Sequence, residues 1–241
     1  MKLWLKVLRD KQIVLAGGSG GLGSATAELL EAEGARLTVS YRSNAERARR
    51  WNGIPANLTI AEDRDRLLAA APLIFGLVVF AGDPARLALS ASLEEALRRS
   101  HEINFLGPIL LAREAAKRMK TAGTPGAIVL ISSMQSSVIF ANSTAYAAPK
   151  ASLEHAAKIL AKENRGSSNI RVNVVSPGVI DAGMAQASIA SGKYERFLKD
   201  GVVHRFGRAE DVARAVRFLL EPDNYITGQV LGVDGGAGLG F

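Results

Sequence analysis

The chain has 241 residues, of which 48% are hydrophobic and 22% are charged; these are the values of a globular protein and exclude a largely disordered chain. Because the sequence contains no cysteine, disulfides and thiolate chemistry are excluded, and because its three histidines lie far apart, we expect no metal site. The formal net charge of +7 is compatible with anionic small molecules, an acidic protein or nucleic acid, and by itself selects none of them.

Apolar runs of strand length alternate with helical patterns along the whole chain. The expected strands are Gln12–Ala16, Arg36–Ser40, Gly53–Ala56, Leu77–Ala81, Ala127–Ile131, Arg171–Val175 and Gln229–Val233. The expected helices are Leu22–Glu33, Ala45–Trp51, Ala61–Ala70, Leu93–Lys120, Thr144–Asn164 and Asp211–Leu220. This alternation predicts an α/β fold, in which a doubly wound parallel sheet of about seven strands carries helices on both faces. We see no linker, so we expect a single domain over residues 1–241.

One segment, Ala182–Phe206, breaks the alternation. It mixes glycines and serines with a short amphipathic patch. It leaves the expected sheet at the carboxyl ends of the strands, where ligands bind in folds of this class. We therefore expect a substrate lid at about residues 182–206.

Neither a secretion signal nor a membrane span is expected. The charged residues Lys6, Arg9 and Asp10 interrupt the N-terminal region where a signal peptide needs an apolar run. The most apolar stretch, Leu67–Gly82, is too short for a membrane span and contains a proline, so it is predicted to be a helix end followed by a buried strand. Together with the absence of cysteine, this gives a cytoplasmic protein as the expectation.

A glycine-rich turn follows the first expected strand and opens the first expected helix. In such a turn, one glycine permits a tight reversal, another lets the backbone approach a phosphate, and a third lets helix and strand pack closely. The start of the helix adds unpaired N–H groups and a partial positive charge. The residues expected to cradle the pyrophosphate of a dinucleotide are Gly17, Ser19, Gly20, Gly21, Leu22 and Gly23. The alternative is a flexible turn that binds no ligand.

Four polar residues further along the chain suggest acid–base chemistry. Tyr146 and Lys150 are four positions apart in a helical pattern, so they share one helix face. Ser133 follows an apolar run and is expected at the carboxyl end of a strand. A tyrosine exchanges protons near neutral pH only where a cation stabilises its phenolate, and Lys150 can supply that cation. Taken singly, Ser133 could be a turn serine and Asn104 a residue that bends or caps a helix.

Together these motifs resemble the short-chain dehydrogenase/reductase family, whose first turn reads T-G-x3-G-x-G, over residues 10–236. The pattern looks most like that of the 3-oxoacyl-acyl-carrier-protein reductases. The resemblance implies a Rossmann-like domain that transfers a hydride between a nicotinamide cofactor and a carbonyl or secondary alcohol, with Tyr146 as the acid/base. It also implies that Lys150 holds the nicotinamide ribose, that Ser133 binds the substrate oxygen, and that Asn104 anchors a water linking Lys150 to solvent.

The resemblance assigns further positions to the cofactor. Besides the glycine turn, Tyr146 and Lys150, they are Arg42, Asn57, Leu58, Ala81, Gly82, Pro177, Gly178 and Ile180. The chain departs from the family pattern by having Ala16 and Ala182 in place of threonine, Phe80 in place of asparagine, and Asn57 in place of aspartate. The amide of Asn57 is expected to pair with the adenine amino group. The change at Ala182 implies either a lower affinity for the cofactor or a different closure of the lid.

The end of the second expected strand favours NADP(H) over NAD(H). An NAD-preferring enzyme of this fold carries a carboxylate there for the ribose hydroxyls, but the position is Tyr41 and a cation, Arg42, follows it. Arg42 can form charge-assisted hydrogen bonds with a 2′-phosphate, and Ser40 or Ser43 can add a hydroxyl. The glycine turn holds no basic residue, so we expect a moderate preference. The alternative is that Arg42 is an exposed loop charge.

The expected partner is a small carbonyl or alcohol, either free or linked to a carrier protein. A cationic rim near the entrance of the site would attract an acidic carrier, although a solvated surface is the simpler interpretation. The residues of this rim are Lys117, Arg118, Lys120, Lys158, Lys162 and Arg165. The resemblance also implies a homotetramer, with a homodimer as second choice, because the family pairs its corresponding long helices across a two-fold axis.

Two other classes of function were considered. Nucleic-acid binding is not expected, because basic residues such as Arg47, Arg49 and Arg50 are spread over helix surfaces that we interpret as solvated. A dinucleotide-binding regulator that has kept the fold without turnover is the main alternative. Such a regulator would have lost the tyrosine or the lysine, and both are present.

Overall fold

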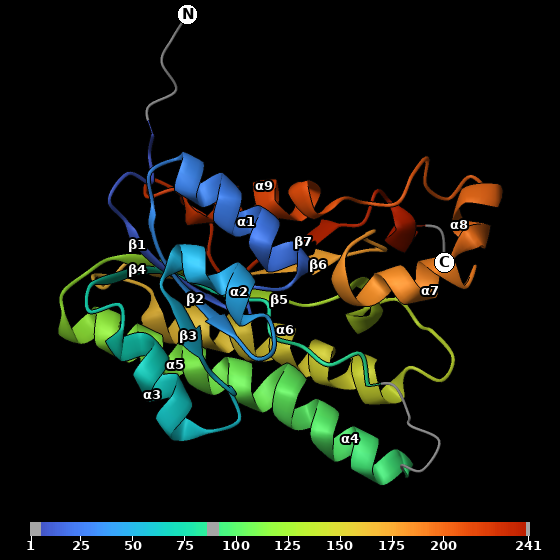
Figure 1. The fold of residues 1–241 in the computed structure, drawn as a ribbon, viewed down its shortest axis with the longest axis horizontal. Coiled ribbons are helices and arrows are strands. Elements are labelled where there is room, and N and C mark those ends of the chain that lie inside the picture. Colours follow the sequence, from blue (N-terminus) through green and yellow to red (C-terminus); the bar gives the residue numbers. More distant parts are fainter. Residues whose placement is uncertain (1–5, 86–91, 240–241) are drawn as a thin grey trace, which may run out of the picture.

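The computed structural model describes residues 6–85 and 92–239. Its strands form one parallel sheet in the order β3-β2-β1-β4-β5-β6-β7, which confirms the predicted doubly wound α/β fold (Figure 1). The strands are β1 Gln12–Ala16, β2 Arg36–Tyr41, β3 Gly53–Pro55, β4 Ile74–Val79, β5 Gly126–Ile131, β6 Ile170–Pro177 and β7 Val230–Val233. The sequence order reverses between β1 and β4, and this reversal opens a crevice at the carboxyl ends of the strands.

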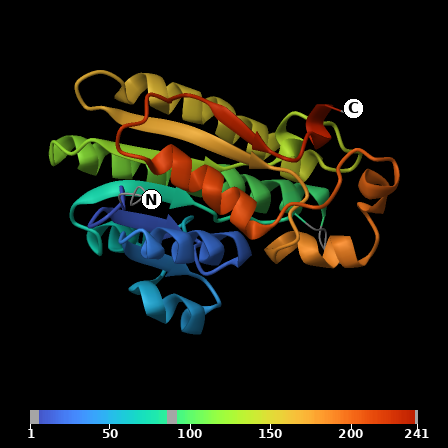
Figure 2. The ribbon, with the colours of Figure 1, turned by 90° about the horizontal axis from the view of Figure 1, so that it is seen from above.

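Helices cover both faces of the sheet (Figures 1 and 2). The helices are α1 Gly21–Ala32, α2 Ala45–Ala48, α3 Ala61–Ala69, α4 Leu93–His101, α5 Gly107–Thr121, α6 Thr144–Asn164, α7 Gln186–Ala190, α8 Glu195–Lys199 and α9 Ala209–Leu220. Helices α1 and α9 pack against each other on one face, while α4, α5 and α6 pack together on the other. The short helices α7 and α8 lie beyond the ends of the strands, in the segment where a lid was predicted.

The predicted helix over residues 93–120 is present, but a π-helical turn, Glu102–Leu106, joins α4 to α5. Pro108 has no N–H, so the carbonyl of Asn104 cannot accept the usual hydrogen bond from four residues ahead. Gly107 N–H instead bonds to the carbonyl of Glu102, five residues back. Periodicity alone does not reveal this extra residue, which places Asn104 in the irregular turn.

The largest difference between predicted and observed strand bounds is in the fourth strand. The fourth strand was predicted at Leu77–Ala81, whereas β4 spans Ile74–Val79. Gly76 lies inside the strand because a Cβ there would come within 3.1 Å of Ile13 on β1 and 3.2 Å of Leu220 on α9. This glycine marks close packing within the sheet, which residue type and spacing do not reveal.

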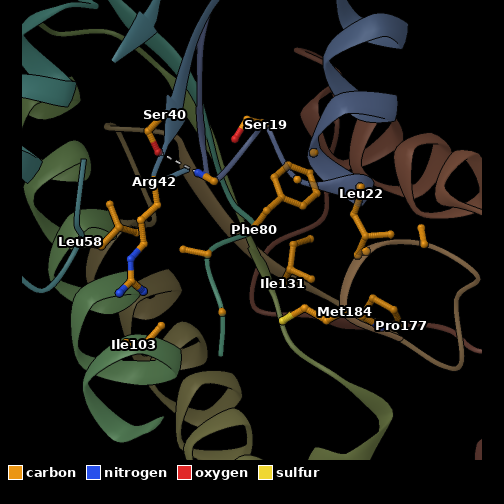
Figure 3. A pocket seen from close by; sticks show the side chains of 18 of the residues that line it. Ser19, Leu22, Ser40, Arg42, Leu58, Phe80, Ile103, Ile131, Pro177 and Met184 are labelled. Carbon is orange, nitrogen blue, oxygen red and sulfur yellow. Dashed lines mark hydrogen bonds between the residues drawn. The ribbon is translucent and has the colours of Figure 1, made fainter. Parts of the chain in front are cut away.

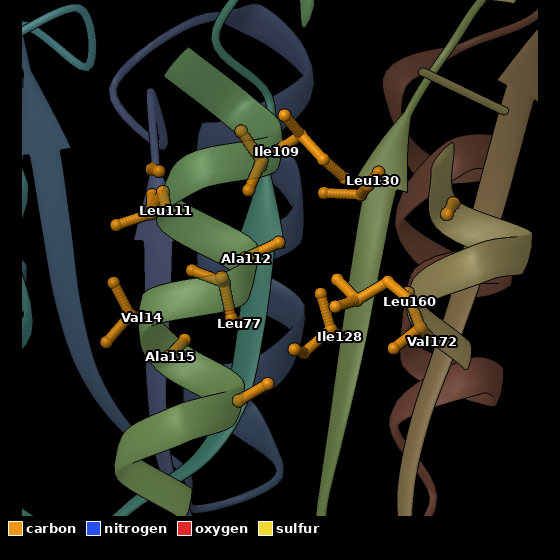
Figure 4. Close-up of a cluster of buried hydrophobic side chains, with 14 of the residues drawn as sticks. Val14, Leu77, Ile109, Leu111, Ala112, Ala115, Ile128, Leu130, Leu160 and Val172 are labelled. Carbon is orange, nitrogen blue, oxygen red and sulfur yellow. The ribbon is translucent and has the colours of Figure 1, made fainter. Parts of the chain in front are cut away.

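Successive side chains of each strand point to opposite faces of the sheet, so the core has two layers. On β1, Val14 packs into the cluster under α5 and α6, while Ile13 packs into the cluster under α1 and α9. Figure 4 shows the first cluster, with Leu77 of β4 between Val14 of β1 and Ile128 of β5. Because both faces are buried, the strands read as continuous apolar runs, and this is why their existence was predictable.

We predict that Leu77→Ala lowers the free energy of unfolding by about 2–5 kcal/mol, because it leaves a cavity in a close-packed core. Leu77 is fully buried, whereas Leu73, four residues earlier, is 67% exposed. The matched control Leu73→Ala is therefore expected to change stability by less than about 0.5 kcal/mol. Chemical denaturation at equal protein concentration gives the free energy of unfolding of both variants. Equal decreases in the two variants would contradict the assignment of Leu77 to the buried core layer.

Candidate active site

A cavity of about 440 Å³ opens at the carboxyl ends of β1, β4, β5 and β6 (Figure 3). This is within the size range of cofactor and ligand sites. The sequence-predicted residues that line it are Gly17, Ser19, Gly20, Gly21, Leu22, Gly23, Arg42, Asn57, Leu58, Ala81, Gly82, Ser133, Tyr146, Lys150, Pro177, Gly178 and Ile180. The structure thus brings together residues from most of the chain, and of the predicted residues only Asn104 lies outside the cavity wall.

The glycine turn forms a backbone cradle on one side of this cavity. Gly17 has a φ of +77°, and a Cβ on it would come within 2.9 Å of the backbone N of Ala81. The N–H of Gly17 donates to Ser40 Oγ at 2.8 Å, the contact drawn as a dashed line in Figure 3. Helix α1 begins without a side-chain cap, so its first N–H groups are available to a phosphate. The cradle therefore fits a dinucleotide pyrophosphate.

Two arginines lie near the end of β2, where one was predicted. Arg42 is exposed and extends along the wall near Leu58, and within the described ranges it has no hydrogen bond or ion pair (Figure 3). Arg47 of α2 donates from its guanidinium to the carbonyl of Ser19 at 3.4 Å. The interpretation of Arg47 as merely a solvated helix residue is therefore incomplete. The direction in which the Arg47 side chain points depends on the bend of the backbone before α2, and the sequence pattern does not reveal this bend.

Polar groups that were expected to face the adenosine end are partly used by the protein itself. Ser40 is buried and holds Gly17, so its hydroxyl supports the turn. Asn57 Oδ1 accepts hydrogen bonds from the backbone N–H and the hydroxyl of Thr59, at 3.2 and 3.1 Å. The oxygen of Asn57 is therefore occupied, and its NH2 group is the one suited to a ligand. This favours an acceptor nitrogen of adenine rather than the predicted amino group.

Ser133, Tyr146 and Lys150 meet at the carboxyl end of β5. Burial raises the pKa of Tyr146, and a hydrogen bond with the Ser133 hydroxyl opposes that rise. Lys150 is buried, and its Nζ donates to the carbonyl of Ile131 at 2.9 Å and lies 5.9 Å from the centre of the Tyr146 ring. Burial lowers the pKa of Lys150 to about 8, and the carboxylate of Glu154 opposes this decrease. The lysine is therefore mostly charged at neutral pH, beside a neutral tyrosine.

Asn104 is fully buried behind the cavity wall. Its Oδ1 accepts from the backbone N–H of Asp83 at 3.0 Å, and its Nδ2 donates to the carbonyl of Asp83 at 2.9 Å and to Ser100 Oγ at 2.8 Å. A Cβ on Gly82 would lie 3.2 Å from Asn104 Oδ1 and 3.7 Å from Lys150 Nζ. The side chain of Asn104 thus holds the backbone that follows β4 against the lysine.

The location predicted for the cationic rim is wrong. Lys117, Arg118 and Lys120 lie at the C-terminal end of α5, which precedes the amino end of β5, and the cavity opens at the opposite edge of the sheet. Lys158 and Lys162 lie likewise toward the C-terminal end of α6, away from Tyr146. These cations therefore do not surround the entrance.

Across residues 6–85 and 92–239, the structure contains no helix that is both long and apolar enough to cross a membrane. Over the same residues, no cluster of three or more acidic or histidine side chains could hold a metal ion.

Comparison with known proteins agrees with this geometry. Residues 16–238 match a family model described as Enoyl-(Acyl carrier protein) reductase. The chain is 36% identical to carbonyl reductase family member 4 of Danio rerio, over 92% of this chain and 96% of that protein. It is 30% identical to a 3-oxoacyl-[acyl-carrier-protein] reductase of Mycobacterium bovis, over 96% of this chain and 94% of that protein.

A short-chain type dehydrogenase/reductase from Mycobacterium ulcerans has the same fold, with a TM-score of 0.87 and 27% identity over 96% of this chain and 91% of that one. The family match covers nearly the whole chain and both strand order and cradle agree with it. The protein is therefore an enzyme of the short-chain dehydrogenase/reductase family, whose members are oxidoreductases that use nicotinamide cofactors.

Proposed function

We propose that the enzyme transfers a hydride between NADP(H) and a carbonyl or secondary alcohol, with Tyr146 as its acid/base. The observation that carries this proposal is the position of Tyr146, beside a buried lysine and in the same cavity as the backbone cradle. Asn104, Ser133 and Lys150 complete the proposed catalytic group. A bound nicotinamide would supply or accept the hydride at the substrate carbon.

The side chains divide the remaining chemistry among them. Reduction leaves charge on the substrate oxygen, and in this proposal Ser133 donates a hydrogen bond to that oxygen while Tyr146 gives it a proton. The hydrogen bond between Ser133 and Tyr146 supports this division of roles. Tyr146 then carries a phenolate, which the Lys150 ammonium stabilises. Because the pKa of Lys150 is about 8, this cation is lost as pH rises above that value. In alcohol oxidation the same proton moves in the opposite direction.

The preference for NADP(H) rests on charge at the end of β2. Tyr41 lines the cavity where a carboxylate would repel a 2′-phosphate, and Arg42 follows it. Arg47 brings a second guanidinium to the edge of the glycine turn. One cation after β2 and another at the glycine turn favour an anionic cofactor more strongly than the single arginine expected from the sequence.

The substrate end of the cavity is mainly apolar. Ile103 and Met184 line the same cavity as Tyr146 and Ser133, and Figure 3 shows these two apolar residues in its wall. We propose that residues 182–206, which include α7 and α8, act as a lid within one catalytic domain of residues 1–241. The names of the relatives given above suit carbonyl substrates that are either free or carrier-linked. The cysteine-free composition suits a cytoplasmic enzyme.

We also propose a homotetramer. Leu93 of α4 and Ile159 of α6 are 56% and 47% exposed on the helices that the family pairs across a two-fold axis. Phe218 of α9 and Leu231 of β7 are 44% and 36% exposed on other elements of the chain. Exposed apolar side chains on both sets of elements suit an assembly with two kinds of two-fold interface.

Tyr146→Phe is predicted to lower kcat by at least about 10²-fold, because it removes the proton donor without removing the ring. The dissociation constant for NADPH, measured by fluorescence, should change little. Tyr225→Phe is the matched control, since Tyr225 is fully exposed. Near wild-type turnover in Tyr146→Phe would refute the assignment. A wild-type protein that binds NADPH but reduces none of a broad panel of ketones would favour the regulator.

Arg42→Leu is predicted to lower kcat/KM for NADPH by about 10-fold or more, and Arg47→Leu by a smaller factor, with little effect on NADH. Tyr41→Asp combined with Arg42→Leu should shift the preference toward NADH. Arg49→Leu serves as the control for a nearby exposed arginine. The preference is measured by steady-state kinetics with both cofactors. A wild-type enzyme that works better with NADH would overturn it.

Light scattering at micromolar concentration is predicted to give four times the chain mass of 25.5 kDa. Replacing Ile159 with a charged residue should convert the tetramer to smaller species, because it places charge in an apolar interface. A monomer mass for the wild type would contradict the proposed assembly.

A further inference from the structure

The helix that carries Tyr146 and Lys150 continues with a carboxylate one turn further on. Lys150 and Glu154 are four residues apart on α6, so their side chains lie on the same part of the helix surface. Glu154 is half-buried and takes no part in the chemistry described above. Its neighbours are the groups on which that chemistry depends.

Glu154 connects α6 to the segment that carries Ser133. Ser136 Oγ donates to Glu154 Oε1 at 2.5 Å. Ser136 ends the short 3-10 helix Met134–Ser136, which begins directly after Ser133. Ser133 caps this helix by accepting from the N–H of Gln135 at 3.3 Å. A bond to Glu154 therefore restrains the position of Ser133 relative to α6.

Glu154 is also the carboxylate that acts on the buried ammonium of Lys150. β5 contributes the carbonyl of Ile131 to Lys150 Nζ, and α6 contributes the Tyr146 ring. The carboxylate of Asp83, which follows Gly82 in the segment held by Asn104, is paired with Arg99 at 2.9 Å. From the segment 182–206, Tyr194 acts on Tyr146 and raises the pKa of its phenol further.

Charged groups on the elements packed against α6 lie elsewhere. His101 and Glu102 of the α4 side line a surface groove with Pro149 and Ser152, on a different face of the helix. The ion pair between Arg113 of α5 and Glu163 lies further toward the C-terminal end of α6. Among the described residues of α6, Glu154 is therefore the carboxylate that shares a helix face with Lys150.

We propose that Glu154 is a positioning residue, which keeps Lys150 charged and holds the Ser133 segment against α6. The proposal rests on the proposed role of Tyr146 and Lys150. It assigns two separable effects to one side chain: its charge acts on Lys150, and its oxygen accepts the hydrogen bond from Ser136. Glu154→Gln removes the charge and keeps an acceptor, while Ser136→Ala removes the bond and keeps the charge.

The charge is tested first on the cofactor-free protein. NMR titration of lysine side chains, with the Lys150 signal assigned by its loss in Lys150→Met, should give a midpoint of about 8 in the wild type. Glu154→Gln should lower this midpoint by about one pH unit, because an opposite charge favours the protonated lysine. Ser136→Ala and the control Glu163→Gln should leave it in place. An unchanged midpoint in Glu154→Gln would overturn the proposal.

The kinetic test uses carbonyl reduction as a function of pH. Because Lys150 must be protonated, activity falls as pH rises through its pKa, and Glu154→Gln should move this alkaline limb to lower pH by a similar amount. Ser136→Ala should lower kcat without moving the alkaline limb. Glu154→Asp, which keeps the carboxylate, should return the limb to its wild-type pH. If the limb does not move in Glu154→Gln, while Tyr146→Phe abolishes turnover, then the inference fails and the proposed function stands. If Tyr146→Phe is active, the proposed function fails, whatever the titration shows.

Discussion

The site is built around a lysine ammonium, Lys150, that is buried where β5 meets α6. Removing a charge from water is costly, so the surrounding elements must satisfy it with hydrogen bonds and oppositely charged groups. Lys150 Nζ donates to the carbonyl of Ile131, and Ser132 Oγ donates back to the carbonyl of Lys150 at 3.3 Å. The backbone after β4 approaches so closely that Gly82 has little room for a side chain. Strand ends, helix and π-helical turn are thus arranged around one cation.

The parts of the site that were predicted from sequence depend on short-range geometry. Tyr146 and Lys150 share a face because a helix repeats every 3.6 residues, and Ser133 lies at the sheet edge because an apolar run ends just before it. Both facts hold whatever the rest of the chain does. The cradle was predictable for the same reason, since Gly17 and its neighbours are required by the backbone conformation of a tight turn.

The parts that were missed or misjudged depend on side-chain direction and tertiary contact. Ser40 turns inward to hold Gly17, Asn57 uses its oxygen on Thr59, and Arg47 reaches back from α2 to Ser19. A residue's type and spacing do not determine which way an exposed or half-buried side chain points. The start of β4 was missed, and inside it Gly76 is required by close packing on Ile13 and Leu220, a contact that the sequence does not show. Rotamers and packing set these features, and periodicity carries no signal for them.

Two of the positions that depart from the family pattern, Ala16 and Phe80, are joined through their backbones. Ala16 ends β1, and Phe80 follows β4; the N–H of Phe80 donates to the carbonyl of Ala16 at 2.8 Å, so the backbone pairing is kept. Their side chains face opposite layers of the core, since Ala16 belongs to the cluster under α5 and α6, whereas Phe80 packs against the cluster under α1 and α9. The Phe80 ring packs at the edge of the core cluster under α1 and lies beside Leu22 of the cradle (Figure 3). The cradle is instead anchored from β2, by Ser40, so its backbone groups are held ready for a phosphate without the hydroxyl and amide that the family pattern places there.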